Sequence, residues 1–99
     1  MEKCKRVGVV ALLVDDREKN AGAVNAVISD FGRLIIGRMG VPYRERSVSI
    51  ISLLVDGDTD ELGAMTGRLG NIPGVRIRTL LLTDGETLPR RHGEDTANG

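Results

Sequence analysis

The segment Leu-Leu-Val-Asp occurs twice in this chain, and it constrains the fold more than any other feature. The first copy covers residues 12–15 and the second covers residues 53–56. Each copy ends an apolar stretch of strand length and leads into a sequence of helical character. Two strand–helix–strand halves with the repeat at the same position predict a β-α-β-β-α-β domain.

Apolar runs and amphipathic stripes place the six elements. Strands are predicted at residues 7–14, 34–39, 47–55 and 75–82, with a loop at 40–46. Helices are predicted at residues 17–31 and 56–70. Their apolar stripes are Val24, Val27, Ile28 and Phe31 in the first helix and Leu62, Met65 and Leu69 in the second. Asp15 with Glu18, and Asp58 with Glu61, have the spacing of capping boxes.

The predicted fold class is therefore α+β. It is a ferredoxin-like antiparallel sheet in the order 4-1-3-2, with both helices on one face. A single domain over residues 1–82 contains all six elements. Residues 83–99 are rich in glycine and charge and lack periodicity, so they are expected to form a flexible tail.

The face of this sheet without helices is too apolar for contact with water. The first strand has Val9 and Leu13 on one face and Val10 and Leu12 on the other, and the third strand is likewise apolar on both faces. Covering one such side chain contributes about 1.5 to 3 kcal/mol. We therefore expect a second copy of the chain to cover the face, in a homodimer or homotetramer. A different client protein docked on this face remains the alternative.

The composition argues against several classes of function. The 14 basic and 14 acidic residues give a formal net charge of zero, which argues against direct nucleic-acid binding. No apolar run reaches the roughly 18 residues of a membrane span. One cysteine, Cys4, allows no intrachain disulfide and fits a reducing cytoplasm. With His92 as the single histidine, we predict no catalytic residues, no metal site and no cofactor.

The segment LIIGRMGVPYRE, residues 34–45, concentrates two glycines, a proline and the single tyrosine. Glycines in a strand indicate a bulge or a close backbone approach, so this strand should lie at the sheet edge. On a regular strand, Ile35 and Met39 share a face. Arg38, Tyr43 and Arg44 would then form a site for an anion or a partner, since arginine pairs with carboxylate or phosphate. The alternative is a bulged edge strand and turn with no ligand.

Three motifs occur in an order that resembles a known family. They are GRMGVPY at residues 37–43, TGRLG at 66–70 and IPGV at 72–75. Over residues 6–82 the chain resembles short proteins described as regulators of the iron-only hydrogenase system. The resemblance implies an ACT-like domain, similar to the sensing domain of the nickel-responsive repressor, that self-associates and regulates. The nickel ligands of that repressor have no counterpart here, so metal sensing is not implied.

The resemblance also implies a place for an effector, because ACT-like domains bind effectors between subunits near the first strand–helix turn. We therefore expect a non-catalytic regulatory module that binds a small effector or a partner protein. The turn and the glycine-rich segment together give the candidate ligand-binding residues. These are Asp15, Asp16, Arg17, Asn20, Gly37, Arg38, Gly40, Tyr43 and Arg44.

Overall fold

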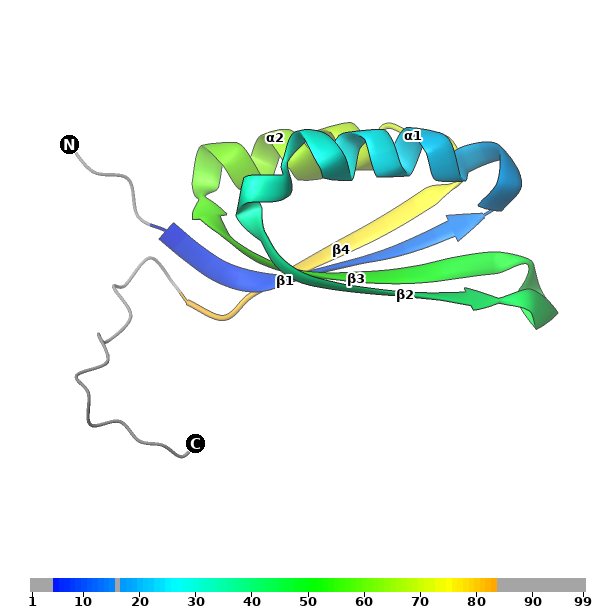
Figure 1. Ribbon diagram of the computed structural model, residues 1–99. Coiled ribbons are helices and arrows are strands. Elements are labelled where there is room, and N and C mark those ends of the chain that lie inside the picture. Colours follow the sequence, from blue (N-terminus) through cyan, green and yellow to red (C-terminus); the bar gives the residue numbers. More distant parts are fainter. Residues whose placement is uncertain (1–4, 16, 84–99) are drawn as a thin grey trace, which may run out of the picture.

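A computed structural model of the chain describes residues 5–15 and 17–83, and it has the predicted order of elements. The elements are β1 (Lys5–Asp15), α1 (Arg17–Asp30), η1 (Gly32–Leu34), β2 (Ile35–Tyr43), η2 (Arg44–Arg46), β3 (Val48–Asp58), α2 (Thr59–Gly70) and β4 (Val75–Leu81). All neighbouring strands are antiparallel, in the order β2-β3-β1-β4. This is the predicted order read from the opposite edge. Both helices lie on one face of the sheet (Figure 1). The predicted fold class is thus confirmed.

The core lies between the helices and the sheet, because both strand faces are apolar but only one is covered. Alternate residues of β1 and β3 point toward the helices, and every second position is buried. The predicted helical stripes meet them there, with Met65 and Leu69 fully buried and Phe31 partly buried. The core residues are Val10, Leu12, Val14, Val24, Val27, Ile28, Leu34, Ile51, Leu53, Val55, Leu62, Met65 and Leu69.

The start of α2 confirms the predicted capping box, although the helix begins later than expected. The Asp58 carboxylate accepts from the Glu61 backbone N–H at 2.7 Å, and the Glu61 carboxylate accepts from the Asp58 N–H at 3.4 Å. Residues 56–58, predicted as helix, instead extend β3, because they pair with residues 5–7 of β1. A side chain at position 57 would require the buried Leu34 side chain to move, since an added Cβ would lie 2.9 Å from Leu34 Cδ2.

Strand β2 corrects two predictions. It continues through Pro42 to Tyr43, where a loop was expected, because Pro42 lies on the sheet edge and pairs with Ser49 of β3. The register of β2 against β3 shifts between Ile35 and Gly37, which confirms the predicted bulge. The extra residue reverses the facing of all later side chains. Ile35 therefore packs against the core while Met39 is exposed on the other side, so their predicted common face was wrong.

At the other sheet edge, hydrogen bonds to β1 continue beyond the end of β4 to Thr83. The Leu82 N–H donates to the Val7 carbonyl at 2.7 Å, and the buried Thr83 hydroxyl accepts from the Val7 N–H at 3.3 Å. The rest of the predicted tail, residues 84–99, lies outside the described residues, as do Cys4, Asp16 and His92.

Candidate functional site

The first strand–helix turn is held by hydrogen bonds between protein groups. The Asn20 side chain is buried, and its Nδ2 donates to the Asp15 carbonyl at 2.6 Å. The Asp15 N–H donates in turn to the Gly74 carbonyl at 2.7 Å. Asn20 thus fixes the start of α1 to β1 and to the turn before β4. Arg17 begins α1, whereas the predicted site residue Asp16 lies outside the described residues.

The alternation of side chains along β2 distributes the other predicted site residues over two faces of the sheet, because β2 continues as a strand to Tyr43. Arg38 and Gly40 lie opposite Leu53 and Ile51 of β3, on the side of the helices. Gly37 and Tyr43 lie on the side without helices, whereas Arg44 is exposed in η2. The structure does not bring Arg38 and Tyr43 together, so these residues cannot form one anion site within a single copy of the chain.

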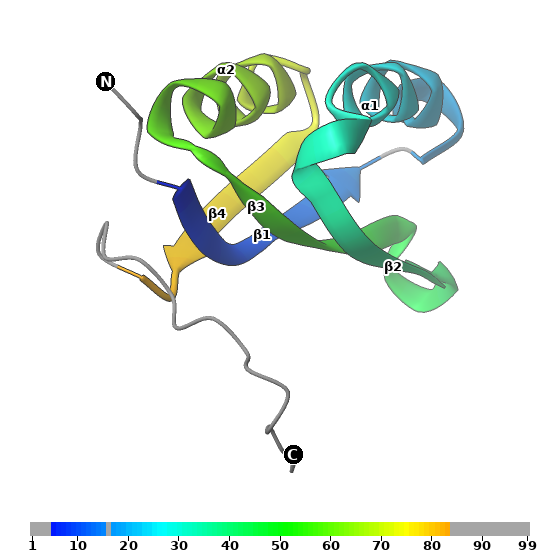
Figure 2. The same cartoon turned by 60° about the vertical axis from the view of Figure 1, so that its left-hand side comes forward.

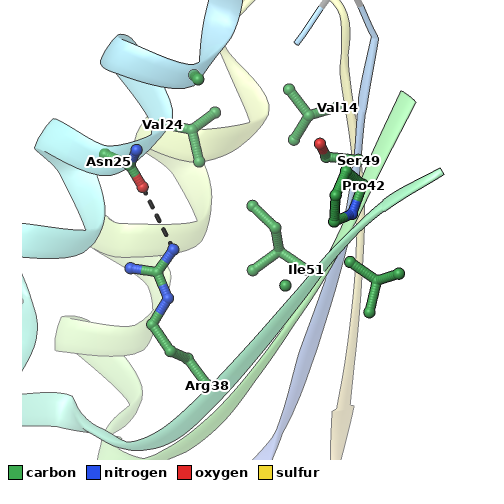
Figure 3. Close-up of a pocket in the computed structure, with 10 residues that line it drawn as sticks. Val14, Val24, Asn25, Arg38, Pro42, Ser49 and Ile51 are labelled. Carbon is green, nitrogen blue, oxygen red and sulfur yellow. Dashed lines mark hydrogen bonds between the residues drawn. The ribbon is translucent and has the colours of Figure 1, made fainter. Parts of the chain in front are cut away.

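Arg38 and Gly40 line a pocket between α1 and the edge of the sheet, which we call the helix-side pocket (Figure 3). Its volume is about 180 Å³. Helix α1 supplies one wall, and strands β1, β2 and β3 supply the floor and the other wall. The lining residues are Val14, Ala21, Val24, Asn25, Arg38, Gly40, Val41, Pro42, Ser49 and Ile51. Seven of these ten residues are non-polar, and three have polar side chains.

These three polar side chains come from different elements. Arg38 of β2 donates from its guanidinium to Oδ1 of Asn25 on α1 at 3.3 Å, across the mouth of the pocket (Figure 3). Ser49 of β3 lies beyond Ile51 as seen from Arg38, and the Ser49 side chain points into the pocket (Figure 3). The Ser49 residue is only 7% exposed, and its Oγ has no hydrogen-bond partner among the described residues. The pocket therefore holds one positive charge and one buried, unpaired hydroxyl.

The second candidate surface is the sheet face without helices, which we call the open face. Among the described residues, no element covers it (Figure 2). Its centre is apolar, as predicted. Cross-strand register places these exposed apolar side chains together on it: Met39, Val41 and Tyr43 of β2, Ile50 and Leu54 of β3, and Leu80 of β4. Met39 is 65% exposed and Leu80 is 64% exposed. Patches of this kind mark interaction surfaces.

Charged residues lie along two margins of the open face. Arg76 and Arg78 project from β4, opposite Leu13 and Ala11 of β1. At the end of the sheet near η2, a groove of about 370 Å³ contains two predicted site residues. Its lining residues are Leu13, Asp15, Tyr43, Arg46, Val48, Ile50 and Arg76. The open face thus brings Asp15 and Tyr43 together, although Arg38 is not part of that site.

Two residues of the helix-side pocket, Asn25 and Ser49, were missed by sequence reasoning. Ser49 carried a signal, because it occupies the inward-facing series of β3 with Ile51, Leu53 and Val55, where a polar residue is out of place. Asn25 carried none, since it is one exposed polar residue beside the apolar stripe of an amphipathic helix. Asn25 accepts a hydrogen bond from Arg38 only because α1 packs close to β2.

Within residues 5–15 and 17–83, no three histidine, cysteine, aspartate or glutamate side chains come close enough to hold a metal ion. Neither helix of this part of the chain is long and apolar enough to cross a membrane.

Comparison with known proteins gives a family and two structural relatives. The model of the family "TM1266-like: Iron-only hydrogenase system regulator, putative" matches residues 6–79. TM1266 from Thermotoga maritima, described as an uncharacterized protein, is 40% identical, with a TM-score of 0.77 over 80% of this chain and 99% of that chain. SnoaB, a cofactor-independent oxygenase from Streptomyces nogalater, has 15% identity and a TM-score of 0.53 over 87% of this chain and 99% of that chain, a likeness of fold alone. Among curated proteins, none matches this chain.

Proposed function

Because the chain belongs to the TM1266-like family of iron-only hydrogenase system regulators, we propose that it is a non-catalytic, ACT-like regulatory module. It acts as a cytoplasmic homo-oligomer that associates through the open face and binds a small effector. The family description supports a regulatory role. The helix-side pocket supports binding, since an arginine, an amide and a hydroxyl can hold a ligand without a general base among them.

The observation that carries the proposal is the exposed apolar centre of the open face. Ile50 and Leu54 occupy the middle of the sheet and are each 45% exposed. Complete burial of one such side chain contributes about 1.5 to 3 kcal/mol, so covering half of that surface on several residues supplies several kcal/mol toward association. A second copy of the chain presents the same apolar centre. Two copies related by a twofold axis therefore cover each other's open face.

Light scattering during size-exclusion chromatography tests this proposal. The wild-type chain of 10.7 kDa should elute at two or four times that mass. Leu54→Lys places a charge at the centre of the open face, and it should shift the chain toward the monomer. Ala26→Lys is the matched control, because Ala26 is exposed on α1 and lies on the opposite side of the molecule. Its mass should remain that of the wild type.

A wild-type chain that elutes as a monomer at micromolar concentration would overturn the proposal. The same holds if Ala26→Lys dissociates the oligomer as completely as Leu54→Lys does. A monomer that instead forms a complex with a different protein through Leu54 would favour the alternative of a module that docks a client.

A further inference from the structure

We propose that the helix-side pocket binds a short aliphatic carboxylate that carries one additional hydrogen-bonding group. In this arrangement the ligand carboxylate pairs with Arg38 and Asn25, and the second group bonds to Ser49. The inference gives the effector of the proposed function a chemical class, and in that sense it rests on the proposed function.

The buried Ser49 hydroxyl is the first observation. A buried polar group without a partner costs about 1 to 3 kcal/mol, and folded proteins rarely keep one without a reason. Ser49 Oγ has no partner among the described residues, and it faces the pocket instead of a neighbouring backbone group. A ligand that places a hydroxyl or carbonyl near this oxygen would satisfy it. The unpaired hydroxyl therefore indicates where the second polar group of a ligand lies.

The Arg38 guanidinium is the second observation. Its one hydrogen bond in the described structure is the contact of 3.3 Å to Asn25 Oδ1, which is long for a charged donor. No carboxylate of the described residues lies within ion-pair distance of it. A guanidinium has five N–H donors in a fixed planar arrangement that fits the two oxygens of a carboxylate. Arg38 can therefore bind a carboxylate in two-point geometry without giving up a protein ion pair.

Asn25 supports this assignment from the opposite wall. Its Oδ1 accepts from Arg38, which orients the side chain across the pocket mouth and leaves the amide N–H₂ as a donor. A carboxylate that binds Arg38 can accept from this amide as well. The two walls of the mouth, α1 and β2, would then be connected through the ligand.

The remaining lining sets the size and the character of the ligand. Ile51 lies between the guanidinium and Ser49, and Val24 of α1 and Pro42 beside Ser49 also line the pocket, so the middle of the ligand contacts apolar side chains. At about 15 to 30 Å³ for each water-sized group, a pocket of about 180 Å³ holds roughly six to twelve non-hydrogen atoms. A carboxylic acid of four to six carbons has this size.

The charge of the pocket favours a carboxylate over a phosphate. Arg38 is the one charged residue of the lining, and the other two polar groups are neutral. A carboxylate brings one negative charge, which one guanidinium balances. A phosphate monoester brings about 1.5 to 2 charges at neutral pH, of which one guanidinium balances only a part.

Calorimetric titration of the full chain tests the proposal with defined probes. These are butyrate, its 2-, 3- and 4-hydroxy derivatives, butanamide and inorganic phosphate. At least one hydroxybutyrate should bind more tightly than butyrate does. Butanamide has nearly the shape of butyrate without its charge, so it should not bind. Absence of binding of every carboxylate up to about 10 mM, or tighter binding of phosphate, would overturn the proposal.

Variants then assign the binding to the named side chains. Arg38→Gln should weaken the affinity for the best hydroxybutyrate about tenfold or more. Arg44→Gln is the control, because Arg44 is an exposed arginine in η2 outside the pocket. Ser49→Ala should reduce the affinity for the hydroxybutyrate to that for butyrate while the urea midpoint stays unchanged or rises. Equal effects of the two arginine variants, or an unchanged affinity in Ser49→Ala, would refute the assignment.

The same samples separate this inference from the proposed function. The helix-side pocket and the open face lie on opposite sides of the sheet and share only Val41 of the edge strand, so ligand binding and molar mass are separate readouts. An oligomer that binds none of the carboxylates overturns the inference alone. A monomer that binds them overturns the proposed self-association and retains the ligand class.

Discussion

Replacement of Gly74 by alanine should destabilise the fold strongly, although the change adds a single methyl group. Gly74 has a φ angle of +86°, a conformation that costs an L-residue about 1 to 2 kcal/mol. An added Cβ would also lie 2.6 Å from Asn20 Nδ2, so the amide must move and release its hydrogen bond to the Asp15 carbonyl. Loss of that buried bond costs about 1 to 3 kcal/mol.

The two costs together predict a decrease of about 2 to 5 kcal/mol in the free energy of unfolding, which is a large part of the 5 to 15 kcal/mol typical of a domain. Urea unfolding followed by circular dichroism measures it, with all variants at one protein concentration because association adds to apparent stability. Gly22→Ala is the control. Gly22 is exposed within α1 and nothing lies within 4 Å of an added Cβ, so this change should stabilise by about 0.5 to 1 kcal/mol.

A double-mutant cycle separates the two costs. In an Asn20→Ala background the added Cβ at position 74 meets no amide, so Gly74→Ala should cost only the backbone part of about 1 to 2 kcal/mol. If Gly74→Ala leaves the urea midpoint of the wild type unchanged, the assignment of Asn20 as the residue that fixes the first turn is wrong. If Gly74→Ala costs the same in both backgrounds, the steric part of the reasoning is wrong.

Two further predictions concern the helix ends. Asp58→Ala removes the carboxylate that accepts from the Glu61 N–H, although it keeps the backbone N–H that donates to Glu61, and it should lower the free energy of unfolding by about 1 kcal/mol in urea titrations; an unchanged midpoint would contradict the role of the cap. Arg68→Gln removes the 3.0 Å ion pair with Asp30 and the contact with the Phe31 ring. Both partners of the ion pair are half exposed, so the loss should stay below about 1 kcal/mol and shrink in high salt, and a salt-independent loss of several kcal/mol would refute this estimate.

The sequence was sufficient to predict the fold because its signals are local and agree with one another. The repeat at residues 12–15 and 53–56 marks equivalent strand ends, and the stripes at Val24 and Met65 mark the buried sides of the helices. The apolar residues on both faces of β1 also predicted correctly that one sheet face remains exposed and apolar. Each strand pattern and each helical stripe is read from residues that are close together in the sequence.

The candidate site was less predictable because it depends on the single extra residue in β2. Without the bulge, Arg38 would lie on the open face and Tyr43 on the side of the helices. The sequence does not show which residue of β2 is the extra one. The pocket also needs Asn25 and Ser49, which are 13 and 11 positions from Arg38 and approach it only when α1 packs over the sheet edge. Such contacts between elements are not encoded in any local pattern.

In the proposed oligomer, the two arginines on β4 would restrict how two copies of the open face can stack. Arg76 and Arg78 line one margin of that face, whereas the β2 side presents Met39, Val41 and Tyr43. If β4 of one copy lay over β4 of another, four guanidinium groups would converge beside an apolar contact, and their mutual repulsion would oppose association. The orientation that avoids this crosses β4 of each copy over β2 of the other. Charge repulsion at the β4 edge would then determine the angle between the two subunits, whereas the apolar centre of the sheet would supply the attraction.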